Sequence, residues 1–370
     1  MNTLTDGPKP LRLGNREAKI PVIQGGMGVG ISLSGLSSAV AEEGGVGVIA
    51  TAGIGFLEPD VYKNFLPANR RALEKEIRKA RNRTTGILGV NIMVALSNYA
   101  DIVETSSREK IDVIFSGAGL PLHLPGFFDL KEDHPALVPI VSSGKAASII
   151  ARQWQRKYDY IPDAVVVEGP MAGGHLGFKL EQIEDPAFAL ERLVPEVIEG
   201  LAGFRTRDGG PIPVIAAGGI YTGGDMYRIM KRHGAAGVQM ATRFVATHEC
   251  DASDKFKDSY LKATERDLRI IVSPVGMPGR AIDGDFLQRV DRGEKQPYTC
   301  PYHCLIPCDY TNTPYCIALA LINAQKGMLS KGFSFAGSNA YRVDKIVSVH
   351  ELVESLMAEY AEAAAGEAGK

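Results

Sequence analysis

A histidine directly follows a pair of glycines in the segment Glu168–Gly177, which reads EGPMAGGHLG. The apolar run Ala164–Val167 precedes this segment and predicts a buried strand. Glycines lack a Cβ, so the backbone N–H groups at Gly173 and Gly174 could approach an anion closely. His175 could then act as an acid or a base on whatever the anion anchors. For this segment alone, a turn that only closes a strand–helix connection is the alternative.

Two later strand ends carry small residues of the kind that bind phosphate. The apolar run Pro213–Ile220 contains the pair Gly218 and Gly219, and the run Gly237–Thr242 ends in Ala241 and a hydroxyl. Adjacent loops of this kind, near the end of an alternating β/α chain, form the phosphate site of many (β/α)8 barrels. The sequence therefore predicts an anion site built from three loops, with a histidine beside it.

Eight strand-like runs alternate with helix-like segments along the chain. Their near-continuous apolar character predicts buried parallel strands, and their number favours a closed α/β (β/α)8 TIM barrel over an open doubly wound sheet. The predicted strands are Ile20–Gln24, Gly47–Ala50, Leu88–Met93, Val113–Ser116, Val138–Ser142, Ala164–Val167, Pro213–Ala217 and Val238–Met240. The predicted helices include Leu36–Glu43, Asn69–Arg83, Gly144–Tyr158 and Gly224–His233.

The 370 residues, of which 45% are hydrophobic, suffice for one large barrel with additions. We expect residues 15–250 to form the barrel core and residues 251–370 to form a C-terminal cap segment packed on it. That segment contains a polar stretch, Lys255–Gln296, which predicts helix and loop, and a cysteine-rich loop at 298–327. It ends in an amphipathic helix, Ser348–Ala365, that packs on the barrel or on a partner subunit.

Composition narrows the class of protein. The formal net charge of −2 shows no excess of basic residues, so we expect no binding to nucleic acid or to an anionic membrane surface. The apolar runs are strand-sized, and the N-terminus lacks the apolar core of a signal peptide, so we expect a cytoplasmic protein. The expected partner is a small-molecule substrate, and a homo-oligomer is compatible with the terminal helix.

Polar and glycine residues stand at several predicted strand ends. Gly25, Gly26 and Met27 follow the first strand, and Asn91 lies within the third, where a buried amide must find partners. Each could be structural alone, but their recurrence at one end of parallel strands favours a cofactor pocket.

Five motifs together resemble the nitronate monooxygenase (2-nitropropane dioxygenase) family of FMN-dependent barrels. They are QGGMG, VNIM, EGPMAGGHLG, IAAGGI and VQMATRF, and the resemblance spans about residues 15–345 in the family's order. This family includes flavin-type enoyl-ACP reductases and some NAD(P)H:quinone reductases. The resemblance implies FMN as cofactor.

The resemblance also implies roles for individual residues. His175 matches the family's active-site histidine. The implied flavin-binding residues lie along the isoalloxazine ring, the ribityl chain and the 5′-phosphate: Gly25, Gly26, Met27, Asn91, Glu168, Gly173, Gly174, Gly218, Gly219, Gln239, Met240, Ala241 and Thr242. At position 241, where relatives often have glycine, this chain has alanine.

The resemblance favours oxidation of alkyl nitronates or nitroalkanes with flavin and O2. A nitronate is an electron-rich carbanion, and His175 could remove the α-proton of a neutral nitroalkane. An NAD(P)H-dependent reductase of enoyl thioesters or quinones is the alternative, although no separate GxGxxG motif for a nicotinamide cofactor follows a strand. A non-catalytic flavin-binding electron carrier is a third possible class of protein, and it is disfavoured because such a protein would not need His175.

Four of the five cysteines gather between Tyr298 and Gly327. They are Cys300, Cys304, Cys308 and Cys316, in the spacing C-x3-C-x3-C-x7-C. Clustered thiols suggest a zinc site or an iron–sulfur cluster, with His303 as an alternative ligand. Buried free thiols that cap the barrel mouth are the other interpretation, since the spacing matches no common C-x2-C pattern. A cluster beside the flavin would favour a reductase.

Overall fold

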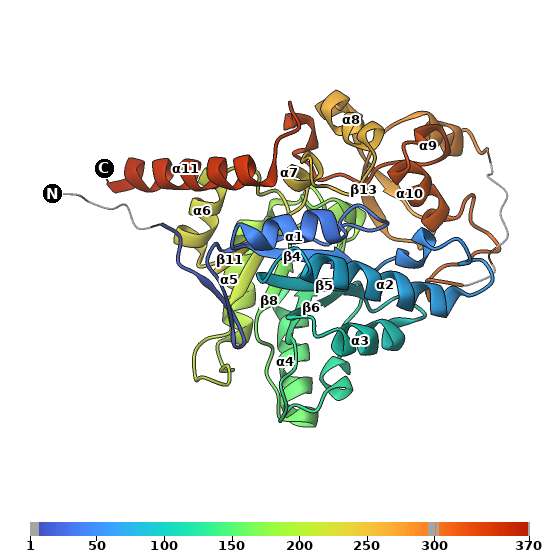
Figure 1. The fold of residues 1–370 in the computed structure, drawn as a ribbon. Coiled ribbons are helices and arrows are strands. Elements are labelled where there is room, and N and C mark those ends of the chain that lie inside the picture. The colour runs from blue at the N-terminus through green and yellow to red at the C-terminus, as the bar shows by residue number, and fades with distance from the viewer. Residues whose placement is uncertain (1–6, 295–299, 301–302, 369–370) are drawn as a thin grey trace.

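The computed structural model describes residues 7–294, 300 and 303–368, and its centre is a barrel of parallel strands (Figure 1). These strands are β3 (Val22–Gln24), β4 (Val46–Ala50), β5 (Ile87–Met93), β6 (Val113–Gly117), β7 (Ala136–Val141), β8 (Val165–Glu168), β10 (Val214–Ala217) and β11 (Gly237–Met240). They close in the order β10-β11-β3-β4-β5-β6-β7-β8. The predicted (β/α)8 TIM barrel is confirmed, and each of the eight predicted strands is present with ends shifted by at most two residues.

Helices surround the barrel and continue beyond it. They are α1 (Ser34–Glu42), α2 (Phe65–Arg81), α3 (Tyr99–Arg108), α4 (Gly144–Tyr158), α5 (Leu190–Leu201), α6 (Gly223–His233), α7 (Thr242–Val245), α8 (Asp254–Lys262), α9 (Asp285–Asp291), α10 (Ile317–Gln325) and α11 (Val349–Ala368). Short 3₁₀ helices occupy Ile54–Leu57, Leu124–Phe127, Leu180–Gln182, Pro186–Phe188, Glu265–Asp267, Leu329–Lys331 and Ala340–Arg342. The four predicted helices named above are confirmed. No helix of the described chain is both long enough and apolar enough to cross a bilayer.

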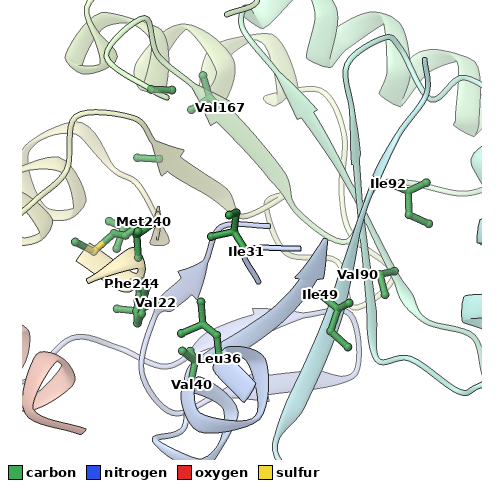
Figure 2. Packing of buried hydrophobic residues seen from close by; sticks show 14 of the residues in the cluster. Val22, Ile31, Leu36, Val40, Ile49, Val90, Ile92, Val167, Met240 and Phe244 are labelled. Carbon is green, nitrogen blue, oxygen red and sulfur yellow. The ribbon is translucent and has the colours of Figure 1, made fainter. Parts of the chain in front are cut away.

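Successive side chains of each barrel strand point alternately into the barrel and toward the helices. The outward set packs against the helices, and Figure 2 shows part of it, with Leu36 and Val40 of α1 in the same buried cluster as Val22 and Ile49. The inward set fills the lower barrel with apolar side chains: Ile23, Val46, Val48, Val113, Phe115, Val138, Val166 and Ile215. The same alternation leaves the upper inward positions, at the carboxyl ends of the strands, free for polar groups.

An N-terminal hairpin belongs to the same inner cluster. It consists of β1 (Leu11–Leu13) and β2 (Arg16–Ala18), which pair antiparallel. Leu11 and Leu13 are fully buried among the inward side chains of the barrel. The hairpin therefore packs the barrel interior at the amino ends of the strands. The cavity for a ligand lies at the carboxyl ends of the strands.

A second, three-stranded sheet lies outside the barrel. It pairs β12 (Leu268–Val272), β13 (Pro278–Ile282) and β9 (Gly174–His175) antiparallel, in the order β12-β13-β9. The prediction of only helix and loop over Lys255–Gln296 was therefore wrong for the two strands β12 and β13, while residues 295 and 296 lie outside the described residues. The burial of β12 does not alternate, since Leu268, Arg269 and Ile270 are half-buried and Ile271 is buried. The strand β9, which pairs with β13, lies about 100 positions earlier in the chain.

The terminal helix α11 packs on the outside of its own barrel. Its Tyr360 ring meets the Tyr227 ring of α6 edge to face at 5.3 Å, and Glu359 accepts a hydrogen bond of 2.7 Å from the Gly223 N–H. The predicted packing of this helix on the barrel exterior is confirmed.

The predicted division of the chain at residue 250 stays a prediction. Residues 298, 299, 301 and 302 of the predicted cysteine-rich loop lie outside the described residues.

Replacing Leu13 by Ala should lower the free energy of unfolding by about 2–5 kcal/mol, because it leaves a cavity in the closed end of the barrel. Urea unfolding followed by circular dichroism measures this loss. The neighbouring Arg12→Ala removes only an exposed ion pair with Asp208 and should change the same free energy by less than about 1 kcal/mol. Equal effects of the two substitutions would contradict this account of the hairpin.

Candidate functional site

A cavity of about 470 Å³ opens at the carboxyl ends of the barrel strands. Every residue that the sequence singled out for flavin or catalysis lines it, so the structure brings the whole predicted set together. These are Gly25, Gly26, Met27, Asn91, Glu168, Gly173, Gly174, His175, Gly218, Gly219, Gln239, Met240, Ala241 and Thr242. Their roles in binding and catalysis stay predictions.

The floor of the cavity depends on a close approach between the first and third strands. A Cβ built on Gly26 would lie 2.3 Å from the Cβ of Asn91, so only glycine leaves room for this amide. The Gly25 N–H donates to the carbonyl of Met240 at 2.8 Å, which joins the first loop to the end of β11. Asn91 therefore presents an amide to the cavity from a position set by packing.

The predicted phosphate loops touch one another at one side of the cavity. Gly218 has φ of +91°, and a Cβ there would lie 2.9 Å from the Gly169 carbonyl oxygen and 3.0 Å from the Ala172 nitrogen. Glycine is thus required both by the backbone conformation and by the contact between the loops after β8 and β10. This geometry is a concave backbone cradle, which suits an oxyanion.

Arg280 of β13 holds the loop after β8 from below. Its Nη1 donates to the carbonyl oxygens of Pro170 at 2.6 Å and Ala172 at 2.8 Å. Burial lowers the pKa of this guanidinium, although it stays charged at neutral pH. The interaction fixes the glycine loop and places a positive charge beside it, which would favour a bound phosphate.

His175 stands in the cavity wall on strand β9. Its Nε2 lies 2.8 Å from the hydroxyl oxygen of Ser273, and its ring meets Phe335 edge to face at 5.1 Å. Ser273 itself is buried in the turn between β12 and β13. Burial lowers the pKa of His175 to about 4, so the imidazole is neutral at pH 7 and available as a base.

Glu168 ends β8 and faces the cavity. Burial raises the pKa of this carboxyl to about 7. In the described part of the chain, no hydrogen-bond donor lies within reach of it. A buried polar group without a partner is unfavourable, and a ligand that donates hydrogen bonds into the cavity would satisfy it.

Sequence reasoning missed one wall of the cavity, the segment Phe335–Gly337. A Cβ on Gly173 would lie 2.6 Å from the carbonyl carbon of Ala336, and Asn339 donates from its amide to the Gly219 carbonyl at 2.8 Å. The only signal was a run of small residues, FAGSNA, about 160 positions after the loop that it contacts. Long-range packing of this kind is not visible in a local pattern.

The structure places Cys304 in the cavity wall, and it leaves all five cysteines free. Among residues 7–294, 300 and 303–368, no three His, Cys, Asp or Glu side chains are grouped so as to hold a metal ion. The predicted metal site at Cys300, Cys304, Cys308 and Cys316, whether an iron–sulfur cluster or zinc, therefore has no support in this geometry. The alternative ligand His303 instead packs its ring against Tyr310, 4.2 Å away.

Comparison with known proteins agrees with the motifs. The family model described as nitronate monooxygenase matches residues 12–359. A protein of Bacillus subtilis described as a probable nitronate monooxygenase is 25% identical over 92% of this chain and 95% of its own length. The structure of FabK from Thermotoga maritima superposes with a TM-score of 0.72, at 29% identity, over 95% of both chains.

A further relative carries a different description. It is a (3aS,4S,5R,7aS)-5-hydroxy-7a-methyl-1-oxo-octahydro-1H-indene-4-carboxyl-CoA dehydrogenase of Mycobacterium tuberculosis, 30% identical over 74% of this chain. The match spans 66% of that relative's length, so about a third of it has no counterpart in the aligned region.

Replacing Arg280 by Met should weaken FMN binding at least tenfold, because it frees the loop after β8 and removes the adjacent charge. Fluorescence quenching of FMN titrated with apoprotein measures the Kd. Arg269→Met is the matched control, since Arg269 lies on β12 and pairs only with Asp283 and Asp291. An unchanged Kd in Arg280→Met, or an equal loss in both variants, would contradict the role of Arg280.

Proposed function

Because the chain belongs to the nitronate monooxygenase family, we propose that it is an FMN-dependent oxidoreductase that oxidises alkyl nitronates or nitroalkanes with O2. The observation that carries the proposal is the meeting of the glycine cradle and a neutral, buried histidine in one cavity. The first would bind the phosphate of FMN, and the second would act on a substrate proton in the same cavity.

FMN fits the residues present. Its phosphate would occupy the cradle of Gly218, Gly219 and Thr242, and Arg280 would balance the charge through the neighbouring loop. The unpartnered Glu168 carboxyl and the Asn91 amide face the same cavity and would hydrogen-bond the ribityl chain and ring. When bound, the flavin supplies the electron acceptor for the substrate carbon.

His175 would then take the proton from the substrate's α-carbon. Its Nε2 is held by Ser273, which leaves Nδ1 as the nitrogen without a partner among the described residues. In the tautomer whose Nε2–H donates to the Ser273 hydroxyl, Nδ1 can accept a proton, and Phe335 restricts the rotation of the ring. A nitronate, already deprotonated, would not need this step, whereas a neutral nitroalkane would.

A reductase of acyl thioesters is the second candidate. The relative described as a carboxyl-CoA dehydrogenase is 30% identical to this chain, and the family that the motifs resemble includes flavin-type enoyl-ACP reductases. The same His175 could give a proton to the α-carbon of an enoyl thioester after hydride arrives at the β-carbon, with NAD(P)H as reductant. Quinones are a further acceptor class for such a reductase.

Two assays on the FMN-loaded protein separate these functions. We expect O2 consumption and nitrite release with propyl-2-nitronate, and no NADH or NADPH oxidation with crotonyl-CoA under nitrogen. Thioester-dependent NAD(P)H oxidation without nitronate turnover would replace the first proposal by the second. Inactivity in both assays with FMN bound would favour a quinone reductase or an electron carrier.

His175→Ala should lower kcat/KM for a neutral nitroalkane by about 10²–10⁴-fold while FMN stays bound, because the expected phosphate contacts are backbone N–H groups, which the substitution leaves in place. His123→Ala is the control, since that histidine is exposed in the loop after β6, does not line the cavity, and contacts Tyr158 at the end of α4. Wild-type rates in His175→Ala would remove the histidine from the mechanism. Loss of FMN would make its role structural.

The pH dependence of the same reaction tests the environment of His175. Burial lowers its pKa to about 4, so the base form exists above that pH and is lost as the pH falls through it. Protonation of His175 should therefore cause no fall in kcat/KM between pH 8 and about pH 5. A fall centred near pH 6.5, the ordinary histidine value, would show that the ring is solvated.

A further inference from the structure

The segment Phe335–Arg342 crosses the two glycine-bearing loops of the proposed phosphate cradle. The Ser338 N–H donates to the Met171 carbonyl at 3.1 Å, in the loop after β8. The side-chain amide of Asn339 donates to the Gly219 carbonyl at 2.8 Å, in the loop after β10. The two loops are in contact at this point, since a Cβ built on Gly219 would lie 3.0 Å from the Cβ of Met171. Ser338 is therefore fixed where they meet.

The same segment also contacts the start of α7, the third element of the cradle. A Cβ built on Gly337 would lie 2.8 Å from the hydroxyl oxygen of Thr242, so glycine is needed for this close approach. At the end of the segment, the guanidinium carbon of Arg342 lies 4.3 Å from the ring centroid of Tyr221, in the loop after β10. These contacts hold Ser338 among all three elements of the cradle.

The hydroxyl of Ser338 is buried and has no hydrogen-bond partner within the described chain. Two other buried side-chain atoms of the described residues lack a hydrogen bond, Arg16 Nε and Arg289 Nε. Each of these nitrogens lies 3.4 Å from a carboxylate oxygen, which balances its charge. Ser338 has no such compensation. A buried hydroxyl without a partner is destabilising, so it indicates a group that binds from outside the chain.

We propose that the Ser338 hydroxyl donates a hydrogen bond to the phosphate of FMN and so completes the cradle. The inference rests on the proposed FMN cofactor, and it adds a side-chain donor to a site whose other expected contacts are backbone N–H groups. A serine hydroxyl can rotate its hydrogen toward an acceptor. A hydrogen bond to a charged phosphate oxygen is about twice as strong as one between neutral groups, so this contact would contribute strongly to FMN binding.

The position of Ser338 favours the phosphate over the other parts of FMN. Glu168 at the end of β8 and Asn91 on β5 are the groups expected to bond the ribityl chain and the ring, whereas Ser338 is anchored to the glycine loops. Arg280 ties the carbonyls of the loop after β8 and adds a positive charge beside it. A bound anion is therefore the expected partner of Ser338, and a buried water molecule is the alternative that an experiment must exclude.

The test compares the full-length wild-type protein with Ser338→Ala in the binding of FMN and of riboflavin, which lacks the phosphate. Flavin fluorescence quenching by the apoprotein measures both Kd values. Loss of one hydrogen bond to a charged group should raise the Kd for FMN about 10- to 100-fold and leave the Kd for riboflavin unchanged. The melting temperature of the apoprotein should stay the same or rise, because alanine removes a buried hydroxyl that has no partner in the described chain.

Ser334→Ala is the matched control, since this buried serine directly precedes the segment and its hydroxyl oxygen lies 3.2 Å from that of Ser259. It should leave the Kd for FMN unchanged. An unchanged Kd for FMN in Ser338→Ala would overturn the inference in favour of a buried water. Equal losses of FMN and riboflavin, or a lower melting temperature of the apoprotein, would show that Ser338 only orders the loops. No FMN binding by the wild-type protein would refute the proposed cofactor, and the inference with it.

Discussion

The pairing of β9 with β13 is the constraint on which the rest of the site depends. Gly279 stands opposite His175, and the Leu176 N–H donates to the Pro278 carbonyl at 2.9 Å. Without this partner, a loop that contains two adjacent glycines would sample many conformations, because glycine loses more backbone entropy on ordering than other residues. The same strand carries Arg280, which ties the loop's carbonyls, so one strand orders both the phosphate cradle and the histidine.

Burial then sets the chemistry of the groups that this strand positions. The cavity is closed from below by the packed barrel interior and on its sides by the segment Phe335–Gly337 and the cysteine-rich segment. Desolvation keeps His175 neutral and raises the pKa of Glu168 to about 7. A carboxyl with a raised pKa and a histidine with a lowered pKa in one cavity are typical of catalytic sites.

The barrel and its cavity residues could be predicted because their signals are local. Most barrel strands are apolar runs that end in or are followed by glycine or a polar residue, and the closed topology brings all the strand ends to one face. The strands β12 and β13 could not be predicted in the same way, because they form a small hairpin without alternating burial, and its third strand β9 has two residues and lies about 100 positions earlier. The contacts of Ser273, Arg280 and Ala336 with the glycine loop were missed for the same reason: each joins segments that lie far apart in the chain.

The central proposal about the cofactor is that the two glycine-bearing loops after β8 and β10, together with the start of α7, enclose one phosphate. Chromatography of the cofactor released by heat, together with its ratio to protein, tests this most directly. The account predicts FMN at about one per chain, since the cradle is closed by the loops after β8 and β10 and by the start of α7. FAD in place of FMN, or no flavin after reconstitution of the folded protein, would contradict it.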